Sequence, residues 1–159
     1  KSEEFKKSGI VIKTIRLKKS GRSAEAMSFE NINYFDIMNE DDWYESRLYD
    51  IFTGRFLFVV FQENENNETV LKKAFFWTMP AQDIAIAEGY WENIRDNVRA
   101  NKISPDNFYK ASNHMKFHVR PKAQNAADVT QNPHGGTVKK YCYWFNQDYI
   151  KEIVEKHSV

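Results

Sequence analysis

The sequence contains a single cysteine, Cys142, so no disulfide can form within the chain. Cys142 lies among aromatic residues, which is typical of a buried, unreactive thiol. The longest unbroken apolar run, Phe56 to Phe61, is six residues long, far short of the roughly 20 that a membrane-spanning helix needs. The sequence also has no signal peptide, and it begins with Lys rather than Met. We therefore expect a cytoplasmic protein, cut from a longer chain, with no membrane partner.

Several classes of enzyme lack their usual sequence signals here. There is no pair of cysteines, no glycine-rich phosphate-binding loop and no nucleophile elbow. His114 and His118 are four residues apart, but their segment alternates like a strand, which separates the two imidazoles by about 13 Å. Metal chelation by this pair is not expected.

The composition is that of one domain with a substantial core. The chain has 159 residues, of which 42% are apolar and 15% aromatic. At this length, roughly 70% of the unfolded chain's surface can be buried, so neither a disulfide nor a structural metal is needed for stability.

The net charge of +1 hides a marked segregation along the chain. Residues 1–22 carry 8 basic and 2 acidic side chains, residues 23–70 carry 2 and 11, and residues 71–159 carry 13 and 9. If the two basic parts meet in the fold, they form a cationic surface suited to nucleic acid, although each run alone is equally typical of a solvated face. The acidic middle is suited to contact with another protein domain.

Hydrophobic periodicity predicts one mixed α/β layer fold, without repeats or an internal linker. Strands are predicted over Ile10–Leu17, Phe56–Phe61 (covered on both faces), Lys73–Met79, Met115–Val119 and Thr137–Phe145. Helices are predicted over Asp41–Thr53, Asp83–Ala100 and Asn146–Lys156. The polar, turn-rich stretch Lys122–Gly136 is predicted to be a long loop.

The first predicted strand invites comparison with DNA-cleaving nucleases, many of which place an acid before a strand and a Glu-x-Lys pair within it. The two carboxylates hold magnesium, and the lysine polarises the attacking water or the phosphate. Here the corresponding residues are Glu4, Val11 and Lys13. Because Val11 has no oxygen, an apolar side chain stands where a metal ligand is needed.

Four blocks of this sequence together resemble the MutH mismatch-repair endonuclease and the related Sau-three-A type restriction enzymes, which recognise GATC. The blocks are GIVIKTI (Gly9–Ile15), FWTMP (Phe76–Pro80), VRPKAQNA (Val119–Ala126) and YWF leading into DYI (Tyr143–Ile150). They occur in the family's order and span nearly the whole chain, and the Arg-Pro-Lys-Ala-x-Asn string is the most specific. Met27-Ser28-Phe29 is similar to the restriction-enzyme branch.

The resemblance implies a PD-(D/E)xK restriction-endonuclease-like fold, with a mixed central sheet flanked by helices. It matches Lys13 to the catalytic lysine, Glu4 to the first metal-binding acid, and Val11 to the metal-binding glutamate that this chain lacks. It therefore implies that residues 1–159 form a single non-catalytic domain, most similar to the C-terminal effector domain of a two-domain type II restriction enzyme. The partners implied are GATC duplex DNA and a catalytic N-terminal domain, with magnesium required by the full-length enzyme and no cofactor for this domain.

Candidate DNA contacts follow from residue chemistry together with the resemblance. An arginine at a strand end, such as Arg120, can offer guanine a bidentate fork, and Pro121 beside it fixes the backbone. Trp144 matches the aromatic position near the methylated adenine, although core packing fits it equally well. Lysines that suit phosphate contacts are Lys122, Lys139 and Lys140, together with Lys72 and Lys73, which fit equally as ordinary strand-edge lysines.

Two other functions remain open from the sequence. In the first, Glu3, Glu4, Glu25 or Asp36 supplies the missing metal ligand, and the domain is an active magnesium-dependent endonuclease. In the second, the acidic middle makes the chain a protein-interaction domain. The second predicts that contact with DNA is insensitive to salt, whereas several phosphate contacts would make affinity fall steeply as salt rises.

Overall fold

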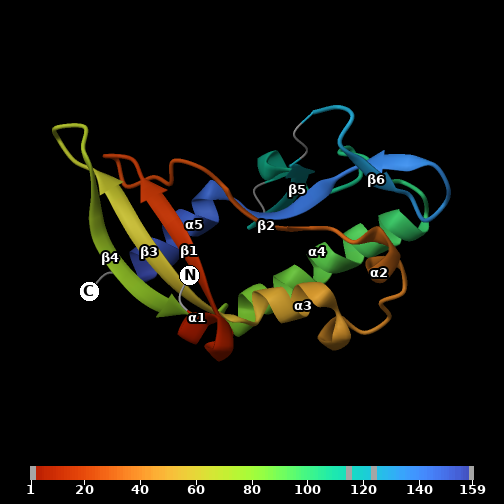
Figure 1. The fold of residues 1–159 in the computed structure, drawn as a ribbon, viewed down its shortest axis with the longest axis horizontal. Coiled ribbons are helices and arrows are strands. Elements are labelled where there is room, and N and C mark those ends of the chain that lie inside the picture. Colours follow the sequence, from red (N-terminus) through yellow and green to blue (C-terminus); the bar gives the residue numbers. More distant parts are fainter. Residues whose placement is uncertain (1–2, 114–115, 123–124, 158–159) are drawn as a thin grey trace.

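The computed structural model describes residues 3–113, 116–122 and 125–157. Helices and strands mix along the chain, and the strands form two three-stranded sheets and one two-stranded hairpin (Figure 1). The predicted mixed α/β class is confirmed. No helix in the described part of the chain is both long enough and apolar enough to cross a membrane.

The first sheet consists of β1 (Ile10–Leu17), β3 (Arg55–Glu63) and β4 (Thr69–Trp77), with β3 in the centre. β1 runs parallel to β3, and β4 runs antiparallel to it. On one face of β3, Phe56, Phe58 and Val60 are fully buried, whereas the alternate residues are only half-buried. The prediction that this strand is covered on both faces is therefore wrong for one face.

The second sheet is antiparallel and has the order β2 (Met27–Asn31), β8 (Tyr141–Phe145), β5 (Phe117–Pro121). Its centre is aromatic: Phe117 and Phe145 are fully buried, and their rings contact each other at 5.6 Å between centroids. The sequence does not predict β2, because Met27–Asn31 is short and ends in the polar pair Glu30 and Asn31.

The two long helices appear where the periodicity predicts them. They are α4 (Ala81–Arg99) and α5 (Gln147–Lys156), and α5 lies behind the first sheet (Figure 1). Shorter helical segments, most of them missed, are α1 (Glu3–Ser8), α2 (Tyr34–Met38), η1 (Trp43–Glu45), α3 (Arg47–Phe52) and η2 (Ala111–Asn113).

The predicted helix over Asp41–Thr53 is broken in two at Ser46. This residue is extended, with φ −76° and ψ 154°, and its hydroxyl accepts a hydrogen bond from the Tyr49 amide, which caps α3. Serine competes well for such a cap position, so the acidic start of the segment becomes the separate turn η1.

The predicted loop Lys122–Gly136 is wrong over part of its length. Its second half forms strand β6 (Val129–Gln131), which pairs with β7 (Thr137–Lys139) across a turn. Gly135 and Gly136 have φ of 106° and 73° there, which glycine adopts without strain. The predicted strand Thr137–Phe145 is correspondingly divided into β7 and β8, with Lys140 between them.

Candidate nucleic-acid interface

Lys13 lies in β1 and reaches across to the second sheet. Its Nζ donates a hydrogen bond to the Ser28 carbonyl oxygen at 2.9 Å and lies 4.7 Å from the centroid of the Phe29 ring. Val11, two residues earlier, is on the same face of the strand and is 37% exposed. Glu4 is exposed on α1. On this face, therefore, the side chain that precedes Lys13 is the hydrocarbon of Val11.

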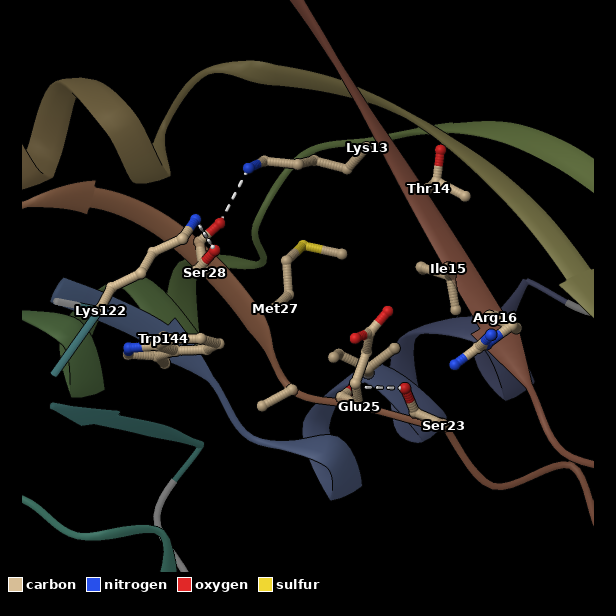
Figure 2. Close-up of a pocket in the computed structure, with 12 residues that line it drawn as sticks. Lys13, Thr14, Ile15, Arg16, Ser23, Glu25, Met27, Ser28, Lys122 and Trp144 are labelled. Atoms are coloured by element: carbon tan, nitrogen blue, oxygen red, sulfur yellow. Dashed lines mark hydrogen bonds between the residues drawn. The ribbon is translucent and has the colours of Figure 1, made fainter. Parts of the chain in front are cut away.

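A pocket of about 370 Å³ adjoins Lys13 along the edge of β1 that faces β2 (Figure 2). Its walls include three cationic side chains, Lys13, Arg16 and Lys122, and one carboxylate, Glu25. Figure 2 shows that the Glu25 carboxylate points into this space.

The acids that could complete a metal site are dispersed. Glu3 and Glu4 are on α1, Glu25 lines the pocket beside Lys13, and Asp36 lines a different pocket together with Glu30 and other residues. Among the described residues, no group of three or more His, Cys, Asp or Glu side chains gathers in a way that could hold a metal ion. Magnesium prefers several oxygen ligands, so the residues around Lys13 do not fit it.

Arg120 and Trp144 form a contact pair on the second sheet. Arg120 is exposed near the end of β5, and its guanidinium carbon lies 3.9 Å from the centroid of the Trp144 ring. The Trp144 Nε1 donates to the Arg120 carbonyl oxygen at 3.1 Å. Trp144 is half-buried rather than a core residue, and Pro121, the last residue of β5, is exposed. A planar, exposed guanidinium held over an aromatic ring is suited to contact with a base edge.

Lys122, directly after β5, joins this group to Lys13. Its Nζ donates to the Ser28 hydroxyl at 2.8 Å, while Lys13 binds the carbonyl oxygen of the same residue. Ser28 and Trp144 are opposite each other in the β2–β8 ladder. The structure thus brings Lys13, Lys122, Trp144 and Arg120 to one region of the molecule.

Of the four other candidate lysines, two are exposed and two are engaged elsewhere. Lys139 is exposed in β7, while Lys140 forms an ion pair with Asp128 at 2.5 Å. Lys72 is exposed in β4. Lys73 donates to the carbonyl oxygens of Val154 and His157, at 3.0 and 2.7 Å, at the C-terminal end of α5. Its ammonium group is therefore held by the helix end.

The positive charges of Lys13, Lys122 and Arg120 affect the pKa of a buried thiol, that of Cys142. Cys142 is fully buried, and burial raises the pKa of its thiol, against the opposing effect of the positive charges on Lys122, Lys13 and Arg120. The thiol is thus protonated and buried, as the sequence suggests.

His118 lies opposite Trp144 in the β5–β8 ladder. The sequence argues against metal chelation by His118 together with His114, and His114 lies outside the described residues. The His118 ring is 1% exposed and stacks at 14° on Trp144. Its Nδ1 bonds to the side-chain oxygen of Asn146, and its Nε2 is buried and has no hydrogen-bond partner among the described residues. Burial lowers the pKa of His118, and the charge of Arg120 adds to that effect, so the imidazole is neutral at pH 7.

Ser28 is the residue that sequence reasoning missed most clearly. Its side chain is one small hydroxyl in an unrecognised strand, so nothing in the local pattern indicates that two lysines from distant segments converge on it. The only available signal was its place in Met27-Ser28-Phe29, the block that resembles the restriction-enzyme branch.

Comparison with known proteins adds two similarities. The family model described as the DNA mismatch repair enzyme MutH matches residues 1–88, which include Lys13 and Ser28. The type II restriction enzyme Sau3AI of Staphylococcus aureus is 29% identical over an alignment of 183 residues, which covers 98% of this chain and 37% of that enzyme. The chain therefore spans little more than a third of the length of this relative.

Proposed function

Because the chain belongs to the MutH family and has a fold consistent with the restriction-endonuclease-like class, we propose that it is a sequence-specific DNA-binding domain that recognises GATC in duplex DNA and does not cut it. In this proposal the domain is the allosteric effector part of a longer type II restriction endonuclease, and it works with a catalytic N-terminal domain of the same protein.

The observation that carries the proposal is the position of Arg120. Its guanidinium is exposed and rests on Trp144 at 3.9 Å, so the fork is displayed rather than used in an internal ion pair. A bidentate contact with guanine O6 and N7 contributes about 1–3 kcal/mol of base discrimination. Pro121 restricts the backbone beside it, and Trp144 provides an aromatic surface next to the contact.

Backbone contacts in this proposal come from the lysines beside Arg120. Lys122 directly follows β5, and the exposed Lys139 lies in β7 near the same end of the β5–β8 pair. Lys140 would have to leave Asp128 to reach a phosphate, and Lys73 would have to leave the end of α5. We therefore propose that Lys122 and Lys139 make the main contacts with the DNA phosphates. Smaller contributions to these contacts come from Lys72, Lys73 and Lys140.

The absence of cleavage in this proposal depends on Val11. A second carboxylate beside Lys13 would be needed to hold magnesium, and the side chain at that position is a hydrocarbon. Magnesium would then serve only the catalytic domain of the full-length enzyme. In that domain the metal supplies a Lewis acid for phosphodiester hydrolysis.

The proposal is tested by measuring the affinity of the purified domain for two duplexes that differ only in a GATC or a scrambled GTAC centre, with magnesium present. We expect tighter binding to GATC by about 4 kcal/mol or more, the lower range for specific over non-specific DNA complexes, and intact strands on a denaturing gel. Equal affinity for both duplexes would contradict the recognition half, and GATC-dependent nicks would contradict the non-catalytic half.

A second candidate function, an active magnesium-dependent endonuclease, would need a further metal ligand from outside the residues around Lys13, in addition to Glu25, which lines the same pocket as Lys13. If Glu25 ligates a metal there, a Glu25→Gln variant abolishes nicking while Val11→Ala leaves it unchanged. If the domain only binds, neither variant nicks DNA.

A further inference from the structure

The strongest unassigned feature is the way two lysines from different sheets converge on Ser28. The Lys13 Nζ donates to the Ser28 carbonyl oxygen at 2.9 Å, and the Lys122 Nζ donates to its hydroxyl at 2.8 Å. Lys13 comes from β1 of the first sheet, whereas Ser28 and Lys122 belong to β2 and the end of β5 in the second sheet. Figure 2 shows both ammonium groups directed at this one residue at the rim of the pocket.

The charge around Ser28 favours an anion. Three cationic side chains and one carboxylate line the adjoining pocket of about 370 Å³, and the charges of Lys13, Lys122 and Arg120 all act on the buried Cys142 thiol. Serine offers only neutral oxygens to the two ammonium groups. A negatively charged oxygen placed between them forms charge-assisted hydrogen bonds, which are shorter and roughly twice as strong as neutral ones.

We infer that Lys13, Lys122 and the Ser28 hydroxyl form a phosphate clamp, which holds one phosphate group between the two sheets without hydrolysing it. Lysine binds phosphate as a compact point charge, and a hydroxyl can donate to a further phosphate oxygen. In the clamp Lys13 is a binding residue rather than a remnant of a cleavage site. The bound phosphate connects β1 to the segment that carries Arg120 and Lys122, so occupancy of the clamp ties the two sheets together.

This inference rests on the proposed function for its ligand source, since the phosphate is that of the DNA backbone. Free inorganic phosphate offers the same chemistry and is distinguished experimentally. A metal ion is the wrong ligand for this place, because the lining cations repel it and the described part of the chain contributes a single carboxylate, Glu25, to the lining.

The test measures duplex affinity as a function of salt for Lys13→Met, Lys122→Met and Ser28→Ala, with Lys102→Met as the control. Lys102 is an exposed lysine beyond the C-terminal end of α4. We expect each lysine variant of the clamp to lose about tenfold in affinity and to reduce the salt slope by about one. Ser28→Ala loses less, and the control changes neither quantity. Unchanged slopes for Lys13→Met and Lys122→Met would overturn the clamp.

A second arm identifies the phosphate. Each phosphate of the duplex is replaced in turn by a neutral methylphosphonate. We expect one position at which the wild-type domain loses more than tenfold, while Lys13→Met and Lys122→Met each lose less at that same position, because each keeps only one of the two clamp lysines. Sensitivity of the two lysine variants to different positions would show that the lysines act separately, and it would overturn the inference.

A third arm separates this inference from the proposed function. Inorganic phosphate is titrated into the DNA-free protein while the Ser28 amide is followed by NMR, in the wild type and in Lys13→Met. A shift that Lys13→Met abolishes supports the clamp even if no duplex binds, in which case the proposed function alone fails. Effects in the duplex arms without such a shift identify the DNA backbone as the source. A response in no arm overturns the clamp.

Discussion

At the scale of single residues, the account depends on how Arg120 is held. An exposed arginine ordinarily samples many rotamers, but here the guanidinium rests on Trp144, a contact that stabilises exposed arginines by about 0.5–1 kcal/mol. The Trp144 indole is in turn anchored to the Arg120 carbonyl oxygen and stacked on His118. The side chain is therefore partly ordered before any base is contacted, which reduces the entropy lost on binding.

His118 makes the free energy of unfolding of the domain depend on pH. Burial and the charge of Arg120 lower the pKa of His118 in the folded protein, so the unfolded chain binds the proton more readily. Above the unfolded pKa of about 6.5 both states are neutral. As pH falls from there through the lower folded pKa, the free energy of unfolding decreases.

We therefore predict that the wild-type domain loses stability between about pH 7 and pH 5, and that His118→Gln loses less. Urea denaturation at a series of pH values measures this directly. His134→Gln is the matched control, because His134 lies between β6 and β7 and is bonded to the Val98 carbonyl oxygen. Parallel pH profiles for the wild type and His118→Gln would show that His118 is not the group that titrates.

At the scale of elements, the sequence predicts the helices and strands whose apolar residues recur at one regular spacing. β1, α4 and α5 have their predicted positions to within two residues. Among the elements that were missed, β2 depends on contacts distant in sequence, whereas the break at Ser46 is a local cap. β2 exists because it pairs with β8, more than 100 residues away, and Met27–Asn31 carries too little alternation to indicate this partner.

The residues of the candidate interface were likewise predictable only where a local sequence pattern marks them. Arg120, Lys122, Trp144 and Lys13 could be named from motif and strand position, because each stands in a recognisable block. Their convergence on Ser28 could not, since it depends on how the two sheets pack. Likewise, the sequence does not show that Lys73 donates to the end of α5, because its partner Val154 lies 81 residues further along the chain.

Lys73 provides a prediction about an element. It donates to the Val154 and His157 carbonyl oxygens at the end of α5, where a cation also complements the helix dipole. We predict that Lys73→Met lowers the free energy of unfolding by about 1 kcal/mol. The neighbouring Lys72→Met, at an exposed position, should change it by no more than about 0.5 kcal/mol. Chemical denaturation of both variants makes the comparison, and equal losses would show that the helix-end contact contributes nothing specific.

At the scale of the whole molecule, the charge segregation of the sequence acquires a spatial meaning. Lys13 and Arg16 from the basic start line one pocket together with Lys122 from the basic end. The acidic Asp36 and Glu40 line a separate pocket with Glu30 and Arg47. The two basic parts thus meet, as a nucleic-acid surface requires, and much of the acidic middle segment is directed elsewhere.

The central claim is that Arg120 reads guanine, and a coupling measurement tests it most directly. The affinities of the wild type and Arg120→Ala are measured for a GATC duplex and for the same duplex with 7-deazaguanine at the GATC guanine, which removes the N7 acceptor. We predict that the wild type loses about 1–3 kcal/mol on the modified duplex, whereas Arg120→Ala binds both duplexes equally. If Arg120→Ala loses as much as the wild type on the modified duplex, Arg120 does not contact that guanine, and the account is contradicted.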